Sequence, residues 1–385
     1  MNAVALKRKR STWISYGQAS AFGWFIYGLG PAMVLLSDEQ GTTPVVMSLH
    51  TSAMALGTII SGALTPAFVV RWGRGRLLRV AGLGIALGIS LLVFAPNTYV
   101  SLSATFLTGI FSAAAVTTTS SFLSHEHGPA SPIALSEANA GAALTGLLSP
   151  LFIGALVGAG FGWRIGLFVA VVALVLLEVF RGPLSNYSQV EAHHTNTHGA
   201  LSRAYWWGWL LIGCTTGAEF ILISWSTELL RSWGGLADAA AVASAATFTS
   251  GLLFGRLILS QLARRLPSET LLRWMLVTAI IASLLFWLAN LAPLMLVALF
   301  LCGLTMAGHW PLGITRLVRL GGNQPDRASA LSAYATGIAG MLMPVVLGMI
   351  AQQVDTHTAF LMLPLVFVAA LLIVLFKPEH PAPAA

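Results

Sequence analysis

The chain has 385 residues, of which 56% are hydrophobic and only 9% charged, and its mean hydropathy is +0.81. Soluble domains carry roughly a quarter charged residues, so this composition excludes a water-soluble globule and predicts an integral membrane protein. The formal net charge is +7, which would also suit a nucleic-acid partner, so the placement of the charges has to decide what they do.

About twelve apolar runs of roughly 20 residues, the length of a membrane-spanning helix, follow one another along the chain. The runs are long and do not alternate between apolar and polar residues, which favours helices over strands. In chain order they lie near 12–37, 45–70, 77–96, 99–123, 134–160, 164–181, 204–230, 238–262, 268–290, 292–315, 327–352 and 356–376.

The first span follows four basic residues, Lys7 to Arg10. A secretory signal peptide also begins with a basic stretch and an apolar run. This run is too long for such a peptide, and no cleavage site of small residues follows it. We therefore expect a retained first helix.

Nearly all the basic residues fall on one side of the membrane if twelve spans alternate, and only Arg164 and Arg231 fall on the other. Basic residues mark the cytoplasmic side, so both termini are expected in the cytoplasm, below an inner or plasma membrane. The net positive charge is then explained by the orientation of the chain in the membrane, and it does not indicate a nucleic-acid partner. The cytoplasmic set is Lys7, Arg8, Lys9, Arg10, Arg71, Arg74, Arg76, Arg79, Arg181, Arg203, Arg264, Arg265, Arg273, Arg316, Arg319, Arg327 and Lys377.

The second half of the chain repeats features of the first half at an offset of 194 residues. Seven glycine pairs keep this offset, whereas composition alone would give about two. We therefore predict two parallel repeats of six helices, with a binding site between them near the middle of the membrane. The glycine pairs are Gly23 and Gly217, Gly41 and Gly235, Gly57 and Gly251, Gly109 and Gly303, Gly128 and Gly322, Gly146 and Gly340, and Gly154 and Gly348.

One repeated pattern places a proline between two glycines inside an apolar span. It reads GLLSPLFIG from Gly146 through Pro150 to Gly154, and GMLMPVVLG from Gly340 through Pro344 to Gly348. Glycine permits close helix approach, and proline frees a carbonyl group and bends the helix. We predict that these residues act in gating, although glycine and proline are also common in membrane helices.

The predicted domains are an N-terminal half at 1–182, a cytoplasmic linker at 183–203 and a C-terminal half at 204–385. The linker contains HHTNTH from His193, which we interpret as solvated linker and not as a metal site. Cys214 and Cys302 are each alone within a span, so two buried free thiols are expected, with no disulfide and no metal framework. No cofactor is indicated.

Several motifs in this order resemble the major facilitator superfamily of transporters. The turn PAFVVRWGRGRLLR matches the loop between the second and third helices of that family at Arg71, Gly73, Arg74 and Arg76, whereas Pro66 and Val70 replace its Gly and Asp. The segment GFGWRIGLF looks like the family's connection between helices five and six.

Two further likenesses concern branches of the family. GLLSPLFIG resembles the gating motif of drug antiporters, with Ser149 replacing a glycine. GAEFILISW and HWPLGITRL are similar to segments of the fucose–proton symporter branch. The resemblance implies a fold of twelve helices, a gating role for Arg71, Gly73 and Arg74, and transport without an enzymatic reaction.

Glu219 is the leading candidate for proton coupling because it lies in the middle of a span, where an ionised carboxylate costs several kcal/mol. A group that is charged when water reaches it and neutral when it is closed off can couple proton movement to a conformational cycle. Thr215 and Ser226 share its helical face. The alternative interpretation is a glutamic acid hydrogen-bonded between helices.

His309, inside the tenth span, is the second proton-coupling candidate, because histidine titrates near neutral pH. A histidine held by packing is an equally acceptable interpretation. The substrate-binding candidates are polar or aromatic residues within the spans, namely Trp24, Tyr27, His50, Trp225 and Trp310. Glu137 and Asn139 open the fifth span near the cytoplasm and are predicted to form a gate or a helix cap.

These observations together predict a transporter that moves a small organic solute by alternating access, with proton coupling. Its partners are the solute, protons and the lipid bilayer, and a monomer already supplies both halves. Proton-driven multidrug efflux is the alternative within transporters. A membrane enzyme or a non-transporting sensor is the alternative from another class, but no catalytic motif and no sizeable soluble segment are visible.

Overall fold

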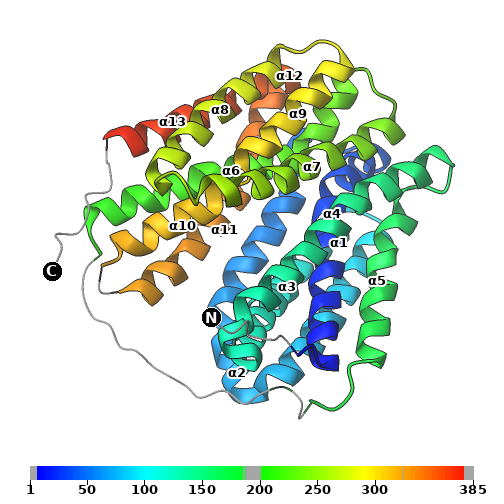
Figure 1. Cartoon of the computed structure of the whole chain (residues 1–385). Helices are drawn as coiled ribbons and strands as arrows, with labels where there is room; N and C mark the ends of the chain where they lie inside the picture. Colours follow the sequence, from blue (N-terminus) through cyan, green and yellow to red (C-terminus); the bar gives the residue numbers. More distant parts are fainter. Residues whose placement is uncertain (1–6, 185–186, 188–200, 323, 377–385) are drawn as a thin grey trace. The chain divides into compact units, whose positions relative to one another are not determined.

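The computed structural model describes residues 7–184, 187, 201–322 and 324–376, which form α-helices joined by short turns (Figure 1). No strand occurs among these residues. In chain order the helices are α1 (Arg10–Gln40), α2 (Pro44–Val93), α3 (Thr98–His127), the 3₁₀-helix η1 (Gly128–Ala130), α4 (Ser131–Gly158), α5 (Trp163–Val179), α6 (Arg203–Ser232), α7 (Asp238–Leu262), α8 (Ser268–Leu288), α9 (Ala292–Met306), α10 (His309–Leu320), α11 (Pro325–Gln353), α12 (Thr356–Ala359) and α13 (Met362–Phe376).

Nine helical segments within the described ranges are long and apolar enough to cross a membrane. One of them, Thr98–Gly158, runs through α3, η1 and α4, and α2 likewise contains two of the predicted spans. α5 has 17 residues, close to the lower limit for spanning. The prediction of an all-helical membrane protein is confirmed.

A single residue, Gly73, interrupts the course of α2. Its φ of 76° and ψ of 159° are not helical. Glycine adopts a positive φ without the steric penalty that other residues meet. The predicted spans 45–70 and 77–96 are therefore two helical segments that meet at Gly73.

Two predicted spans each remain one apolar segment long enough to cross a membrane, but each consists of two helices. The span predicted at 292–315 consists of α9 and α10, and the span predicted at 356–376 consists of α12 and α13. Pro311 and Pro364 lie in the first turns of α10 and α13. Proline has no backbone N–H group to donate, so it suits the start of a helix and interrupts its interior.

The chain divides into two compact units, which we call unit 1 and unit 2. Unit 1 consists of residues 1–42, 49–194 and 238–246, and unit 2 consists of residues 43–48, 195–237 and 247–385. The beginning of α2 therefore belongs to unit 2, and the beginning of α7 belongs to unit 1. Most of the predicted linker 183–203, with its HHTNTH segment, and Lys377 lie outside the described residues.

Each unit is held by its own set of packed helices. In unit 1, α1 packs against α4 and α5, and α3 packs against α4. In unit 2, α6 packs against α10, α11 and α13, and α8 packs against α9 and α13. Large buried side chains at these contacts include Phe25, Trp225 and Phe286. In lipid, such side-chain packing holds helices together, because lipid tails are as apolar as the side chains.

Glycines bring neighbouring helices into backbone contact at corresponding places in both units. In unit 1, a Cβ atom added at Gly57 would overlap the carbonyl oxygen of Phe106. In unit 2, a Cβ atom added at Gly251 would overlap the carbonyl oxygen of Phe300. Both residues of the second contact follow their counterparts by 194 positions, so the glycines repeated in the sequence make matching helix contacts.

A buried polar network joins α1 and α2 to the residues that follow α5 in unit 1. The side chain of Arg181 is completely buried and donates to Glu178 Oε2 at 2.7 Å, to Gln18 Oε1 at 2.9 Å and to the Tyr187 hydroxyl at 3.0 Å. Gln18 Nε2 in turn donates to the Leu78 carbonyl at 3.1 Å. Burial raises the pKa of Tyr187, which keeps its phenol neutral.

Removal of Arg181 should destabilise the protein because the buried Glu178 would keep only its longer pair with Arg79, at 3.6 Å, and Gln18 would lose its donor. Breaking a buried pair in this way costs about 3–5 kcal/mol. We expect Arg181→Ala to lower the melting temperature of the purified protein by ~5 °C or more. Lys9→Ala removes an exposed partner, since the side chain of Lys9 is 68% exposed in its pair with Glu126, and should change the melting temperature little. Equal melting temperatures for the two variants would contradict a stabilising role for the network.

Candidate functional site

Glu219 lies in the middle of α6 and is half-buried. Thr215, one turn earlier, donates its hydroxyl to the carbonyls of Leu211 and Ile212 in its own helix, at 3.0 and 3.2 Å. Ser226 is buried. The hydroxyl of Thr215 is therefore satisfied locally, and the carboxyl group is the chemically distinctive feature of this face.

Arg256 is a charged residue inside α7 that the sequence analysis missed. It lies six residues before the end of the helix, about 9 Å along the axis. Side chains of a helix tilt toward its N-terminus, so the guanidinium reaches further toward the helix centre. An arginine inside the predicted span 238–262 was itself the available signal, because charges within spans are rare and usually functional.

The face of α7 that carries Arg256 differs from the face with exposed apolar side chains. At about 100° per residue, Arg256 shares its face with Thr249 and Leu252, which are buried. It is rotated by about 200° from Phe254 and Ile258, which are exposed. Arg256 is itself exposed. The guanidinium therefore points away from the apolar face that suits lipid.

Glu219 and Arg256 interact electrostatically, since the positive charge of Arg256 acts on the Glu219 carboxylate. No direct ion pair joins the two side chains within the described part of unit 2. The opposite charges on α6 and α7 therefore influence each other without a fixed ion pair. Such a pair can respond to a proton or to a charged solute.

His309 begins α10 and is buried, with only 3% of its surface exposed. Its ring centroid lies 5.7 Å from that of Phe367 on α13. Trp310, the next residue, is 50% exposed. The two adjacent candidates therefore differ in exposure, because the His309 side chain is buried inside unit 2 and the Trp310 side chain is half exposed.

The aromatic candidates in unit 1 have neighbours within the helix packing. Trp24 donates its indole N–H to the Gly166 carbonyl at 2.8 Å and meets Phe152 edge to face. Tyr27 packs its ring against Gly146. Trp24 thereby ties α1 to α4 and α5, and Tyr27 ties α1 to α4.

His50 and Trp225 are both buried but differ in their hydrogen bonding. His50 Nε2 lies 2.8 Å from the Ser101 hydroxyl, which joins α2 to α3. The indole N–H of Trp225 has no hydrogen-bond partner in the described structure. Because a buried donor of this kind costs free energy, Trp225 is the aromatic candidate best suited to meet a ligand or a water molecule.

The repeated glycine–proline pattern lies in α4 and α11, with Pro150 and Pro344 inside the helices. In unit 1, a Cβ atom added at Gly154 would lie 2.6 Å from the Ala239 carbonyl oxygen and 2.8 Å from the Ala243 Cβ, at the beginning of α7. The pattern therefore permits backbone contact between α4 and α7.

The second copy makes a corresponding contact in unit 2. A Cβ atom added at Gly348 would lie 2.9 Å from the Ser48 hydroxyl and 3.1 Å from the Pro44 carbonyl oxygen, at the beginning of α2. Gly340 packs against the ring of Phe220. Each copy of the pattern thus meets the first turns of a helix that is otherwise assigned to the other unit.

The predicted gate residues around Gly73 line a polar pocket of about 350 Å³ in unit 1. Arg71, Arg74 and Arg76 contribute to its wall together with Tyr187. Arg74 is buried, whereas Arg71 is exposed. The turn is therefore a concave, positively charged surface.

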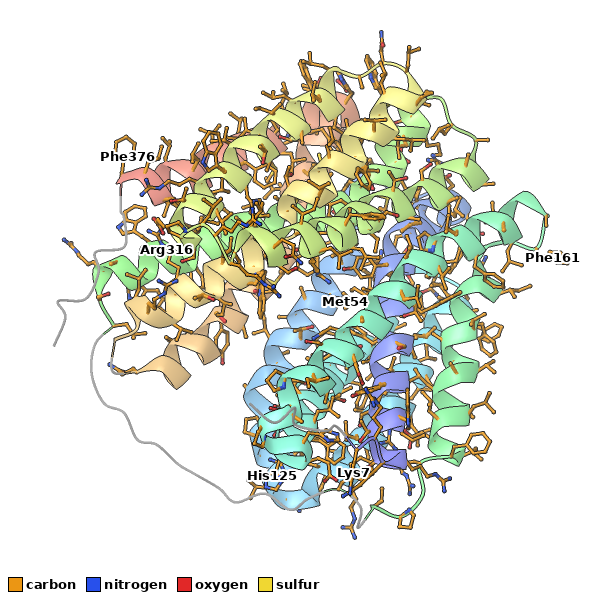
Figure 2. The ribbon with its side chains drawn as sticks, in the orientation of Figure 1. Lys7, Met54, His125, Phe161, Arg316 and Phe376 are labelled. Carbon is orange, nitrogen blue, oxygen red and sulfur yellow. The ribbon has the colours of Figure 1, made fainter. Side chains whose placement is uncertain are left out.

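Glu137 pairs with the segment that precedes α1. Arg8 Nε donates to Glu137 Oε2 at 2.8 Å, and Tyr16 donates to the same oxygen at 3.1 Å. Asn139 donates to the Leu135 carbonyl of its own helix at 2.9 Å. Figure 2 shows Lys7 and His125 at one end of unit 1 and Phe161 at the other, and the Glu137 cluster belongs to the end with Lys7.

Metal chemistry finds no support in the part of the chain that the structure describes, because no group of three His, Cys, Asp or Glu side chains there could hold an ion. Cys214 and Cys302 are free and buried, as predicted.

A sequence profile of the Major Facilitator Superfamily matches residues 17–323 of this chain. The comparison with curated protein sequences finds no match. Solved structures of transporters, in contrast, match over nearly the whole chain.

A bacterial homolog of the human lysosomal transporter Spinster, in an inward-facing and occupied conformation, aligns with a TM-score of 0.78 at 13% identity, covering 99% of this chain and 100% of that one. The nucleoside transporter NupG aligns with a TM-score of 0.76 at 12% identity, covering 97% and 99%. A variant of the E. coli fucose:proton symporter FucP aligns with a TM-score of 0.62 at 16% identity, covering 96% and 100%. Identities this low establish the shared fold and not a shared solute.

The contact at Gly154 generates a prediction about the packing of α4 on α7. Gly154→Ala adds a methyl group where backbone lies 2.6 Å away, so α7 has to move, whereas Gly158→Ala places its methyl 3.4 Å from the Ala239 Cβ, an ordinary contact. We expect Gly154→Ala, but not Gly158→Ala, to open the buried site Val242→Cys to a water-soluble maleimide, with severalfold faster labelling. The native thiols are buried and should contribute little background. Equal labelling rates in both backgrounds would show that this contact does not control access.

Proposed function

Because the chain belongs to the major facilitator superfamily, we propose that it is a secondary active transporter that moves a small organic solute across the membrane by alternating access, with proton coupling. The observation that carries the coupling is the pair of opposite charges, Glu219 and Arg256, within membrane helices of one unit. The solute, protons and lipid are the proposed partners, the chain acts as a monomer, and no enzymatic reaction is proposed.

The proposed topology has twelve spans in two parallel repeats of six, at 1–182 and 204–385, joined by a cytoplasmic linker. It is supported by the matching contacts of Gly57 and Gly251, because a duplicated fold should make the same contact twice. Gly73 divides α2 into two spans, and η1 separates α3 from α4. Dividing two of the nine apolar segments in this way gives eleven spans, and α5, with 17 residues, is the proposed twelfth.

Both termini are proposed to lie in the cytoplasm, beneath an inner or plasma membrane. Lys7, in the basic segment before α1, lies at the same end of unit 1 as His125, which follows the predicted fourth span 99–123 (Figure 2). Phe161, between α4 and α5, lies at the opposite end. Such an alternation agrees with the positive-inside rule, which assigns the basic end to the cytoplasm.

In this proposal, proton coupling arises because Glu219 either binds a proton or has its charge offset by Arg256. When Glu219 is ionised, Arg256 offsets its charge, and when Glu219 is protonated, Arg256 needs another anion or water. The cost of an uncompensated charge in the membrane makes the two events dependent on each other. Arg256 is thus added to the predicted coupling residues, with His309 as the next candidate.

The proposed solute site lies near the middle of the membrane, with Trp225 as its best aromatic candidate because its buried N–H is unpartnered in the described structure. Tyr27 and Trp310 are retained as further candidates. Gating is assigned to the two glycine–proline patterns and to the turn around Gly73.

Proton-driven drug efflux is the second candidate within the family. The shortage of paired polar groups in the expected cavity favours an apolar substrate, whereas Ser149 and Val70 depart from the motifs of drug antiporters. Uptake and efflux move the solute in opposite directions relative to the proton, so one flux measurement separates them.

Glu219→Gln should strongly slow solute-dependent proton movement, because an amide cannot exchange a proton. The measurement uses proteoliposomes with a pH dye inside and a panel of sugars, organic acids, nucleosides and dyes outside. We expect an active solute to change the internal pH with the unaltered protein. With Glu219→Gln the change should be at least ~10-fold slower, since a positioned proton-transfer group typically contributes a factor of about 100 or more.

Arg256→Gln should impair the same flux, while Arg256→Lys, which keeps the charge, should retain part of it. Glu126→Gln is the matched control, because Glu126 forms an ion pair with exposed Lys9 and should leave the flux unchanged. Undiminished proton movement in Glu219→Gln would remove Glu219 from the mechanism. Solute flux without any proton movement would contradict proton coupling while leaving transport intact.

A further inference from the structure

A groove of about 470 Å³ lies on unit 2 between α7, α8 and α9. Its wall is apolar except for two threonines, with side chains that include Ile258 and Leu262 from α7, Leu271 and Trp274 from α8, and Leu304 from α9. These helices have the composition of membrane spans, so the groove lies within reach of lipid.

The two hydroxyl side chains of the groove already use their only donor hydrogen within their own helices. Thr278 donates to the Trp274 carbonyl at 2.9 Å, and Thr305 donates to the Cys302 carbonyl at 3.1 Å, each within its own helix. A polar solute would lose its hydrogen bonds to water here without compensation. The wall therefore suits a hydrocarbon.

The length of the groove suits an acyl chain. Along α8 the lining extends from Leu271 to Leu285, about 21 Å of helix. One leaflet contributes about half of the ~30 Å hydrocarbon thickness, so the groove is long enough to take a chain from the membrane surface to the midplane.

One end of the groove carries a concentration of positive charge. Arg264 and Arg265 lie in the turn between α7 and α8, between the lining residues Leu262 and Leu266, and both are exposed. No ion pair involves either of them within the described part of the chain. Trp274, which is 64% exposed, lies at the same end of α8. Tryptophan is enriched where a helix meets the membrane surface.

Glu269, the carboxylate at the start of α8, does not neutralise the charge of Arg264 and Arg265. Glu269 pairs with Arg316 at 2.5 Å and with Arg273 at 3.6 Å, so one negative charge already faces two arginines. Figure 2 marks Arg316 in unit 2, on α10. The surplus charge of Arg264 and Arg265 is therefore free to meet an anion.

We propose that this groove and the turn with Arg264 and Arg265 form a binding site for an anionic phospholipid, with an acyl chain along α8 and the phosphate headgroup on the two arginines. Basic clusters at the cytoplasmic membrane surface attract anionic lipids. The site is distinct from Glu219 and Arg256, so it stands whether or not transport is coupled to protons.

The test measures lipids retained by the full-length purified protein in native mass spectrometry, after addition of phosphatidylglycerol or of phosphatidylcholine with the same chains. We expect phosphatidylglycerol to be retained preferentially, and Arg264→Gln/Arg265→Gln to weaken its binding about tenfold or more, because two headgroup contacts are lost. Lys7→Gln/Arg203→Gln removes two exposed basic charges that do not line the groove and should leave binding unchanged. Arg264→Lys/Arg265→Lys should preserve it.

The acyl chain has its own test. Thr278→Phe fills the groove, whereas Thr315→Phe places the same side chain at an exposed position outside it whose hydroxyl also bonds to its own helix. We expect a phosphatidylglycerol with brominated chains to quench the fluorescence of Trp274, measured as the difference from Trp274→Phe, in the unaltered protein and in Thr315→Phe but not in Thr278→Phe.

Three results would overturn the proposal. Equal retention of the two lipids would indicate ordinary annular lipid, and equal losses in the two charge-removing double variants would indicate a nonspecific effect of charge. Glycerol phosphate that competes as well as the intact lipid would show that the groove plays no part.

Discussion

The bilayer gives a polar group no partner, and this constraint acts on the charges in and beside the membrane spans. Water is absent from the hydrocarbon, so a charged side chain there must meet another protein group or a water-filled space. Arg181 meets three side chains, and Glu269 meets two arginines. Glu219 and Arg256 stand apart because each influences the other without a fixed bond. An unlocked charge within a membrane helix is the kind of group that a transport cycle can use.

The second constraint is that membrane helices associate by close packing. Gly57 and Gly251 admit neighbouring backbones at matching places, and Gly154 and Gly348 do so at the first turns of α7 and α2. A contact between two backbones is sensitive to a single added methyl group. The same contact can also separate without breaking a hydrogen-bond network.

Much of the fold could be predicted from the sequence because hydrophobic length and glycine spacing are local signals. The predicted span 238–262 coincides with α7, and both cysteines are buried as expected. The breaks between α9 and α10 and between α12 and α13 lie inside single apolar spans, so apolar length does not reveal them, although Pro311 and Pro364 lie close to them.

The site was less accessible to sequence reasoning because it depends on which helices become neighbours. The bond from Trp24 to Gly166 and that from His50 to Ser101 join residues far apart in the chain, and no local pattern indicates them. Arg256 was visible as a charge within a span, but only its effect on Glu219 shows its significance. The roles of the candidate residues in binding, coupling and gating stay predictions.

Alternating access is the central claim, and distances between spin labels on the two halves test it most directly. One pair, Phe161→Cys and Leu291→Cys, reports on the proposed outer side, and the other pair, His125→Cys and Ala263→Cys, reports on the proposed cytoplasmic side. All four positions are exposed. In nanodiscs, pulsed electron paramagnetic resonance at pH 8 and pH 5, with and without an active solute, should show one distance lengthening as the other shortens. Two distances that stay constant, or that change in the same direction under every condition, would contradict the account.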